Sequence, residues 1–221
     1  MSFRETALEI IREKIRGADW IREPLVGFAD VSSAHIRGLR SSAADDHLMP
    51  EDVLPEAEII ISYFLNNFSA INRASNKFLP FTRAAGECNR DGDFPSQLWA
   101  DLYNRTNALI TEINEALVSA LEAEGVKAAV PAGGFDTERL LSRWSQRHVA
   151  EAAGLGTFGV NNMLITRAGS MGRFGSVVTA LKEKADLPMT EELCISKAGG
   201  GCLACVKRCP TGALSADGFD R

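Results

Sequence analysis

The stretch that most constrains the fold is residues 57–65, AEIIISYFL. The run is almost wholly apolar, it is too short to cross a membrane, and it contains three consecutive β-branched isoleucines. Such short apolar runs are typical of a strand that is buried on both faces. We therefore predict that residues 57–65 form a central strand.

Helical patterns lie on both sides of this strand. Ser2 followed by Glu5 is a capping-box signature, and apolar residues at helical spacing predict a first helix over residues 3–16. Apolar residues recur at the same spacing over residues 96–124, and Gly125 stands where a helix C-cap is expected. The chain should therefore contain a short N-terminal helix and one long helix.

The remaining segments alternate irregularly between helix and strand. Residues 67–95 are polar and contain Gly and Pro, which indicates a long connection. We expect a short strand at 127–130, an amphipathic helix over 137–153, and two strands at 163–166 and 174–181. This mixture favours an α+β fold with three layers.

Composition sets the class of protein and excludes some partners. The 221 residues carry a net charge of -5 and a pI near 5.3, so the sequence has no clear nucleic-acid surface. The N-terminus lacks the apolar core of a signal peptide, and no window reaches the roughly 18 apolar residues of a membrane helix. We expect a cytoplasmic protein that does not enter a membrane.

Four of the five cysteines crowd into the segment Cys194-x7-Cys202-x2-Cys205-x3-Cys209-Pro. The last part, C-x2-C-x3-C-P, is the closing half of the bacterial ferredoxin run, and crowded thiols in a reducing cell favour metal ligation over disulfides. We predict a 4Fe-4S cluster with these four cysteines as ligands. The chain then divides into a cofactor-binding-like domain at 1–185 and a cysteine cluster segment at 186–221.

Two alternatives stay open for the cysteine segment. A structural zinc site would normally pair two C-x2-C hooks or add histidines, and neither is present nearby. In the ferredoxin run the cysteine before proline ligates a second cluster. Cys209 would then serve another centre, and the natural protein would continue beyond Arg221. Cys88, alone in the polar connection, is expected to be a free thiol.

Two further motifs precede the cysteines. The segment from Trp144 to Thr166 contains AGLG-x2-G-x-N-x-M-LI-T, and Gly175-Ser176 follows it. Together with C-x2-C-x3-CPTGA, these motifs resemble the superfamily of epoxyqueuosine reductases and reductive dehalogenases. The resemblance is specific over residues 127–215. It implies a nitroreductase-like core that binds cobalamin, followed by a ferredoxin-like segment with up to two 4Fe-4S clusters.

The resemblance also implies a cofactor site beside the glycine turn. The residues placed there are Gly154, Gly156, Thr157, Gly159, Asn161, Gly169 and Ser170, with His148 on the preceding helix. The acid of epoxyqueuosine reductase falls at Leu140 in an ungapped alignment, with Asp136 and Glu138 nearby. A second cluster motif is missing from the sequence.

Simpler roles compete for several of these residues. His148 shares a helical face with Trp144 and is more often a packing histidine than a proton donor. Gly154-x-Gly156-x-x-Gly159 matches the dinucleotide fingerprint, but it follows a helix, whereas a Rossmann turn follows a strand. Asp136 and Glu138 stand where a helix N-terminus attracts carboxylates.

The sequence therefore supports three hypotheses. The first is an iron-sulfur oxidoreductase that resembles epoxyqueuosine reductase and passes electrons from a ferredoxin or flavodoxin to a bound cofactor, such as a corrinoid, or to a small-molecule substrate. The second is a non-enzymatic ferredoxin-type electron carrier or assembly partner. The third is a structural zinc-binding domain.

Overall fold

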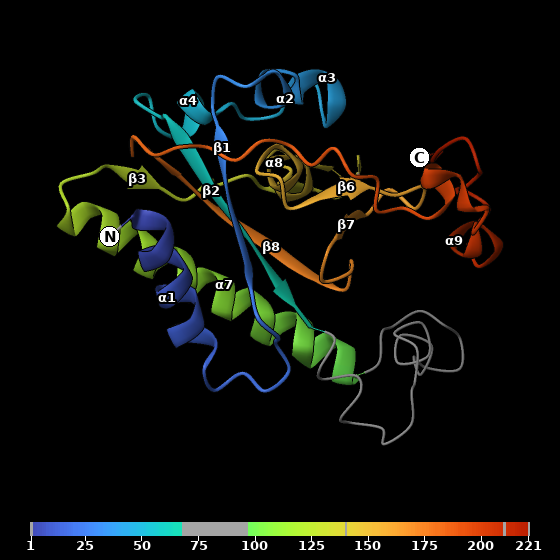
Figure 1. Ribbon diagram of the computed structural model, residues 1–221, viewed down its shortest axis with the longest axis horizontal. Helices are drawn as coiled ribbons and strands as arrows, with labels where there is room; N and C mark the ends of the chain where they lie inside the picture. Colours follow the sequence, from blue (N-terminus) through green and yellow to red (C-terminus); the bar gives the residue numbers. More distant parts are fainter. Residues whose placement is uncertain (1, 68–96, 140, 210, 221) are drawn as a thin grey trace.

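The computed structural model describes residues 2–67, 97–139, 141–209 and 211–220. Its centre is an antiparallel sheet in the order β1-β2-β8-β3. The strands are β1 (Leu25–Asp30), β2 (Ile59–Asn66), β8 (Gly172–Thr179) and β3 (Ala128–Ala129). Figure 1 shows the long strands crossing the middle of the molecule. The predicted central strand is confirmed, because β2 pairs on both sides and all eight of its residues are buried.

One face of the sheet is covered by α1 (Phe3–Ile15) and α7 (Gln97–Ala123), which lie side by side (Figure 1). Both helices agree with the sequence prediction, and the capping box of Ser2 and Glu5 is present. Ile61 and Tyr63 point from β2 into this layer. The Tyr63 hydroxyl donates to Asn114 Oδ1 at 2.8 Å, so the one polar atom of that side chain has a partner inside the core.

The other face is covered by α8 (Gln146–Ala152) together with the short helices α2 (Ala34–Arg37), α3 (Leu39–Ser42) and α4 (Pro50–Val53). Ile60 of β2 and Trp144 pack in this second cluster. Gly27 of β1 permits the close approach of the chain after α8, because a Cβ there would lie 2.2 Å from the Ala153 carbonyl oxygen. The predicted three layers are therefore present.

The predicted helix over 137–153 is wrong in its first half. A hairpin of β4 (Phe135–Asp136) and β5 (Leu141–Ser142) occupies that part, and α8 begins only at Gln146. The Asp136 carboxylate accepts from the backbone N–H groups of Glu138 and Arg139, both at 2.9 Å. It therefore closes the turn of a hairpin and does not cap a helix. Leu140, Cys88 and the connection at 67–95 lie largely or wholly outside the described residues.

A second hairpin of β6 (Gly156–Phe158) and β7 (Leu164–Thr166) follows α8. The expected strands at 163–166 and 174–181 are present, but β7 pairs with β6 and β8 pairs with β2. The cysteine segment follows as a π-helical turn, η1 (Ser196–Gly200), and α9 (Ala204–Lys207), beside β6 and β7 at one end of the molecule (Figure 1). Among the helices described, none has both the length and the apolar character to cross a bilayer.

The chain between β8 and the cysteine segment is fixed to the sheet edge at Asp186. Its backbone N–H donates to the Phe28 carbonyl at 2.7 Å, and its carboxylate accepts from the Phe28 N–H at 2.8 Å. Arg4 of α1 pairs with the same carboxylate at 2.7 Å. The predicted boundary at residue 185/186 thus coincides with an anchoring point, and the division into two domains stays a prediction.

Candidate functional site

Three of the four clustered cysteines open into one cavity. Cys194, Cys202 and Cys205 line a space of about 310 Å³ whose opposite wall comes from the β6–β7 hairpin through Val160, Asn161 and Ile165. Residues up to 45 positions apart in the sequence therefore meet at one place. The spacing of the cysteines predicts this grouping for the thiols. The family resemblance implied a cofactor role for Asn161 beside the glycine turn, and the structure places it on the wall of the cysteine cavity.

The environment of the Cys194 sulfur favours a thiolate. Burial alone would raise the pKa of this thiol, but the backbone N–H groups of Lys197, Val160 and Ser196 outweigh burial and lower the pKa. Hydrogen bonds of this kind to ligand sulfurs are a feature of iron-sulfur sites. Cys194 is 9% exposed, Cys205 is half-buried and Cys202 is exposed. The cavity thus has a buried side and an open side.

Cys209 is not among the residues that line this cavity. Its Sγ lies 3.5 Å from Thr211 Oγ1. That hydroxyl, together with the N–H groups of Leu214, Thr211 and Gly212, lowers the pKa of the Cys209 thiol to about 7. A sulfur so surrounded is easily ionised and available as a ligand at neutral pH.

Two kinds of metal site place different demands on the thiols. A single tetrahedral zinc ion needs sulfurs that converge to about 2.3 Å from one point. Across the described parts of the chain, no group of three or more His, Cys, Asp or Glu side chains is gathered in that way. A four-iron cluster binds each thiolate at a different iron and so needs donors spread around a cavity. Cys194, Cys202 and Cys205 are three thiols that line one cavity, and a donor set of thiols is compatible with such a cluster.

The glycines on both sides of β7 have structural explanations. A Cβ at Gly156 would lie 2.1 Å from the Ile165 carbonyl oxygen, and Gly154 adopts a φ of +71°. Gly169 has a φ of +92° and exchanges backbone hydrogen bonds with Thr166, while Ser170 beside it is half-buried. A cofactor role for Gly154, Gly156, Gly159, Gly169 and Ser170 stays a prediction.

Thr157 anchors the cysteine segment to β6. Its hydroxyl donates to Glu192 Oε1 at 3.0 Å and accepts from the Leu193 N–H at 3.1 Å. Glu192 Oε1 also accepts from the Cys194 N–H at 2.8 Å, and Glu192 Oε2 pairs with Lys197 Nζ at 2.9 Å. Sequence reasoning missed Glu192 and Lys197, because their partners lie about 35 residues away along the chain.

The two histidines near α8 have different environments. His148 is half-buried, its Nδ1 lies 2.7 Å from Ser145 Oγ, and its ring contacts Phe158 with centroids 4.6 Å apart. These contacts agree with a packing role. His47 was not singled out by the sequence, yet it is fully buried: Nδ1 donates to the Leu48 carbonyl at 2.5 Å, and Nε2 accepts from the Ser145 N–H at 2.8 Å.

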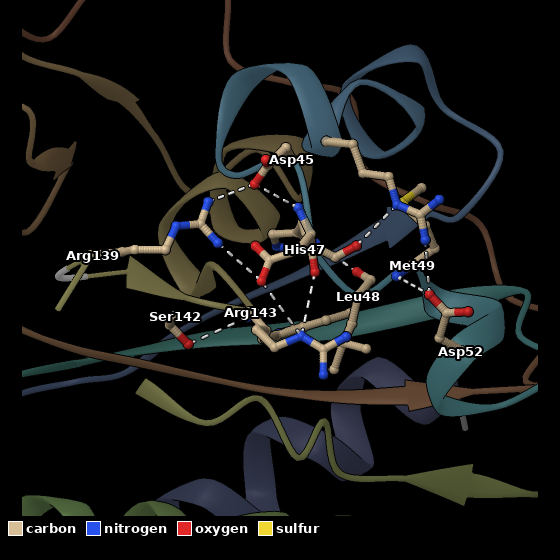
Figure 2. Close-up of polar contacts among 11 residues, drawn as sticks. Asp45, His47, Leu48, Met49, Asp52, Arg139, Ser142 and Arg143 are labelled. Carbon is tan, nitrogen blue, oxygen red and sulfur yellow. Dashed lines mark hydrogen bonds and ion pairs between the residues drawn. The ribbon is translucent and has the colours of Figure 1, made fainter. Parts of the chain in front are cut away.

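Ion pairs surround the buried His47, as Figure 2 shows. Arg139 of the β4–β5 hairpin contacts Asp45 at 2.5 Å and Asp46 at 3.2 Å. Arg143 follows β5 and lies 3.8 Å from Asp46. Because the aspartates precede α4 and the arginines belong to the hairpin region, these pairs join two segments that are far apart in the sequence.

Comparisons with known proteins agree on one family. The chain is 28% identical to the epoxyqueuosine reductase of Listeria monocytogenes over 183 residues, which are 82% of this chain and 42% of that protein. It is 31% identical to the epoxyqueuosine reductase of Bacillus cereus over 167 residues, which are 75% of this chain and 38% of that protein. No family model matches the sequence. The chain thus spans less than half the length of these curated relatives.

Solved epoxyqueuosine reductases share the fold. The structure from Bacillus subtilis has a TM-score of 0.56 and 20% identity, and the match covers 96% of this chain and 54% of that chain. Another, solved with an epoxyqueuosine-modified tRNA stem loop, has a TM-score of 0.55 over the same shares. That protein binds RNA, whereas the net charge of this chain led us to expect no clear nucleic-acid surface. The total charge of a protein does not report whether one region of its surface is basic. The resemblance noted in the sequence is confirmed: this chain is similar in sequence and in fold to the epoxyqueuosine reductases, a family of redox enzymes.

Proposed function

We propose that this chain is an iron-sulfur oxidoreductase of the epoxyqueuosine reductase type. A 4Fe-4S cluster is held at three of its irons by Cys194, Cys202 and Cys205, with the fourth iron left to a ligand other than these three, and it delivers electrons to a substrate or cofactor near the β6–β7 hairpin. The observation that carries the proposal is the single cavity into which these three thiols open. Cys209 is left for a second centre, as the cysteine before proline is in the ferredoxin run.

The chain's own residues supply the surroundings that a cluster needs. The N–H groups near Cys194 stabilise the thiolate, and hydrogen bonds to ligand sulfurs also set the reduction potential of a cluster. Val160 and Ile165 give the cavity an apolar wall, which limits the access of water. When bound, the cluster would supply one electron at a time.

A corrinoid is the further cofactor that the family resemblance implies. Gly154 of the glycine turn lines a cavity of about 290 Å³, together with Arg167 and Met189, and this cavity is separate from that of the cysteines. The proposal of a corrinoid rests on the resemblance, and titration with hydroxocobalamin tests it.

RNA is the substrate class that the comparisons favour. One solved neighbour is an epoxyqueuosine reductase with a tRNA stem loop. In this chain, basic side chains lie around the β6–β7 hairpin: Lys197 donates to the Phe158 carbonyl, and Arg147 donates to the Asn162 carbonyl. We propose that a tRNA nucleoside is the electron acceptor and that this end of the molecule receives it.

Anaerobic reconstitution with iron and sulfide tests the proposal. The wild-type chain should develop broad absorption near ~400 nm and a reducible, EPR-active centre. Cys205→Ser should abolish cluster uptake, whereas Cys88→Ser should leave it unchanged. Uptake of zinc alone would overturn the proposal in favour of a structural metal domain.

The loaded protein then separates enzyme from carrier. Oxidation of the reduced cluster by an epoxyqueuosine-containing stem loop would support the hypothesis of an enzyme. A spectral change on titration with hydroxocobalamin would support a bound corrinoid. A cluster that forms but reacts with neither, while exchanging electrons with a flavodoxin, would identify a non-enzymatic electron carrier instead.

A further inference from the structure

Glu192 holds the start of the cysteine segment against β6. One carboxylate oxygen, Oε1, accepts both from Thr157 Oγ1 at 3.0 Å and from the Cys194 N–H at 2.8 Å. The other oxygen, Oε2, pairs with Lys197 Nζ at 2.9 Å. Glu192 therefore bonds to β6, to the backbone of the first cysteine and to the η1 turn at once.

Lys197 gives the cysteine segment a further contact with β6. Its Nζ also donates to the Phe158 carbonyl at 2.6 Å, so the η1 turn is attached to β6 at a second point. The Thr157 hydroxyl in turn accepts from the Leu193 N–H at 3.1 Å. The backbone on both sides of Cys194 is thus fixed by side chains that are themselves bonded to one another.

Burial makes these contacts stronger than ordinary surface pairs. The Glu192 side chain is 27% exposed, whereas the neighbouring Glu191, which pairs with Arg167, is 57% exposed. Hydrogen bonds to an ionised group are about twice as strong as neutral ones. Exposed ion pairs, in contrast, contribute little to stability. Glu191 therefore offers a control of the same type, the same charge and the adjacent position.

We infer that Glu192 is a positioning residue for Cys194: its carboxylate fixes the cysteine backbone on β6 so that the thiol opens into the cavity shared with Cys202 and Cys205. The same negative charge, close to the ligands, lowers the reduction potential of the centre. The effect of Glu192 on the reduction potential rests on the proposed function, because it requires a bound cluster. The effect of Glu192 on the position of the Cys194 thiol does not require a cluster.

Alkylation of the cluster-free protein tests the positioning role by itself. Glu192→Ala should speed the alkylation of Cys194 about tenfold or more, as expected when charge-assisted hydrogen bonds are lost, with Cys202 unchanged. Glu192→Gln keeps an oxygen acceptor for the Cys194 N–H but removes the charge, so it should restore most of the protection. Glu191→Ala should behave as wild type. Equal rates for Glu192→Ala and Glu191→Ala would overturn the inference.

Reconstitution of the same variants tests the effect on the cluster. Glu192→Ala should take up iron more slowly than Glu191→Ala and lose it sooner, while Glu192→Gln should load normally and show a higher reduction potential. An unchanged potential in Glu192→Gln would overturn the electrostatic part. A wild-type chain that loads no cluster would overturn the proposed function, and the alkylation rates would still decide the positioning role.

Discussion

The environment of His47 fixes its charge. The ring is fully buried against Trp144, with Arg40, Asp46 and Ser145 also facing it. Burial is the main cause that lowers the pKa of this histidine from 6.5, and the positive charge of Arg40 acts in the same direction. The neutral ring also fits the Ser145 N–H, which needs an acceptor at Nε2.

A lowered pKa in the folded state gives a defined pH dependence. The stability that His47 contributes is complete above pH 6.5 and is lost as the pH falls further, because the unfolded chain takes up the proton first. For one proton, the free energy of unfolding falls by at most about 1.4 kcal/mol per pH unit. Urea unfolding at pH 7.5, 6.5 and 5.5 should show this loss in the wild type and a flatter profile in His47→Gln. The exposed His35→Gln should keep the wild-type profile, and a flat wild-type profile would contradict the assignment.

Single residues also show what the sequence could and could not predict about the site. The grouping of Cys194, Cys202 and Cys205 follows from their spacing, because local spacing restricts where nearby thiols can point. Glu192 gives no such signal, since it looks like any exposed carboxylate until the fold brings Thr157 beside it. The reverse holds for Gly156, which looks like a cofactor residue but is required by the approach of the Ile165 carbonyl.

Charged contacts connect the β4–β5 hairpin to the segment that precedes α4. Arg139 connects it to Asp45 and Asp46, and these side chains are at least 42% exposed. Arg139→Leu should therefore leave the free energy of unfolding almost unchanged, because exposed ion pairs contribute little to stability. It should nevertheless increase amide hydrogen exchange in residues 135–142, because the strands are only two residues long.

A matched control exists for this hairpin prediction. Arg37 pairs with Glu51 at 2.7 Å, and its side chain is 45% exposed, close to the 42% of Arg139. Arg37→Leu should leave exchange in residues 135–142 unchanged. Similar exchange in the two variants would show that Arg139 does not hold the hairpin.

Elements were predictable in proportion to the strength of their local patterns. The first helix and β2 are close to the predicted ranges because one has a cap and the other an unbroken apolar run. The predicted helix over 137–153 included most of the hairpin, because Leu141 continues the helical spacing of Trp144 and His148. The turn at Asp136 and the ion pairs of Arg139 decide that segment, and neither is visible in a periodic pattern.

At the scale of the whole molecule, β2 joins two hydrophobic clusters. Its odd-numbered residues face α1 and α7, and its even-numbered residues face α8. Trp20 belongs to the first cluster and Trp144 to the second. Because the same strand forms one wall of both clusters, neither layer can lose its packing without disturbing the other. We expect the two layers to unfold together.

Two adjacent isoleucines of β2 provide the test. Ile60 and Ile61 are both 0% exposed but face opposite layers, so replacing either by Ala should cost about 2–5 kcal/mol. In single-tryptophan versions that keep only Trp20 or only Trp144, each isoleucine substitution should shift both fluorescence transitions to the same lower temperature. A variant in which Ile61→Ala moved the Trp20 transition and left that of Trp144 in place would show two independently stable layers. The cysteine segment is anchored at two points: Asp186 bonds to Phe28 of β1, and Leu193 bonds to Thr157 of β6, the strand that follows α8. A common unfolding transition would therefore also mean that cluster binding stabilises the whole molecule.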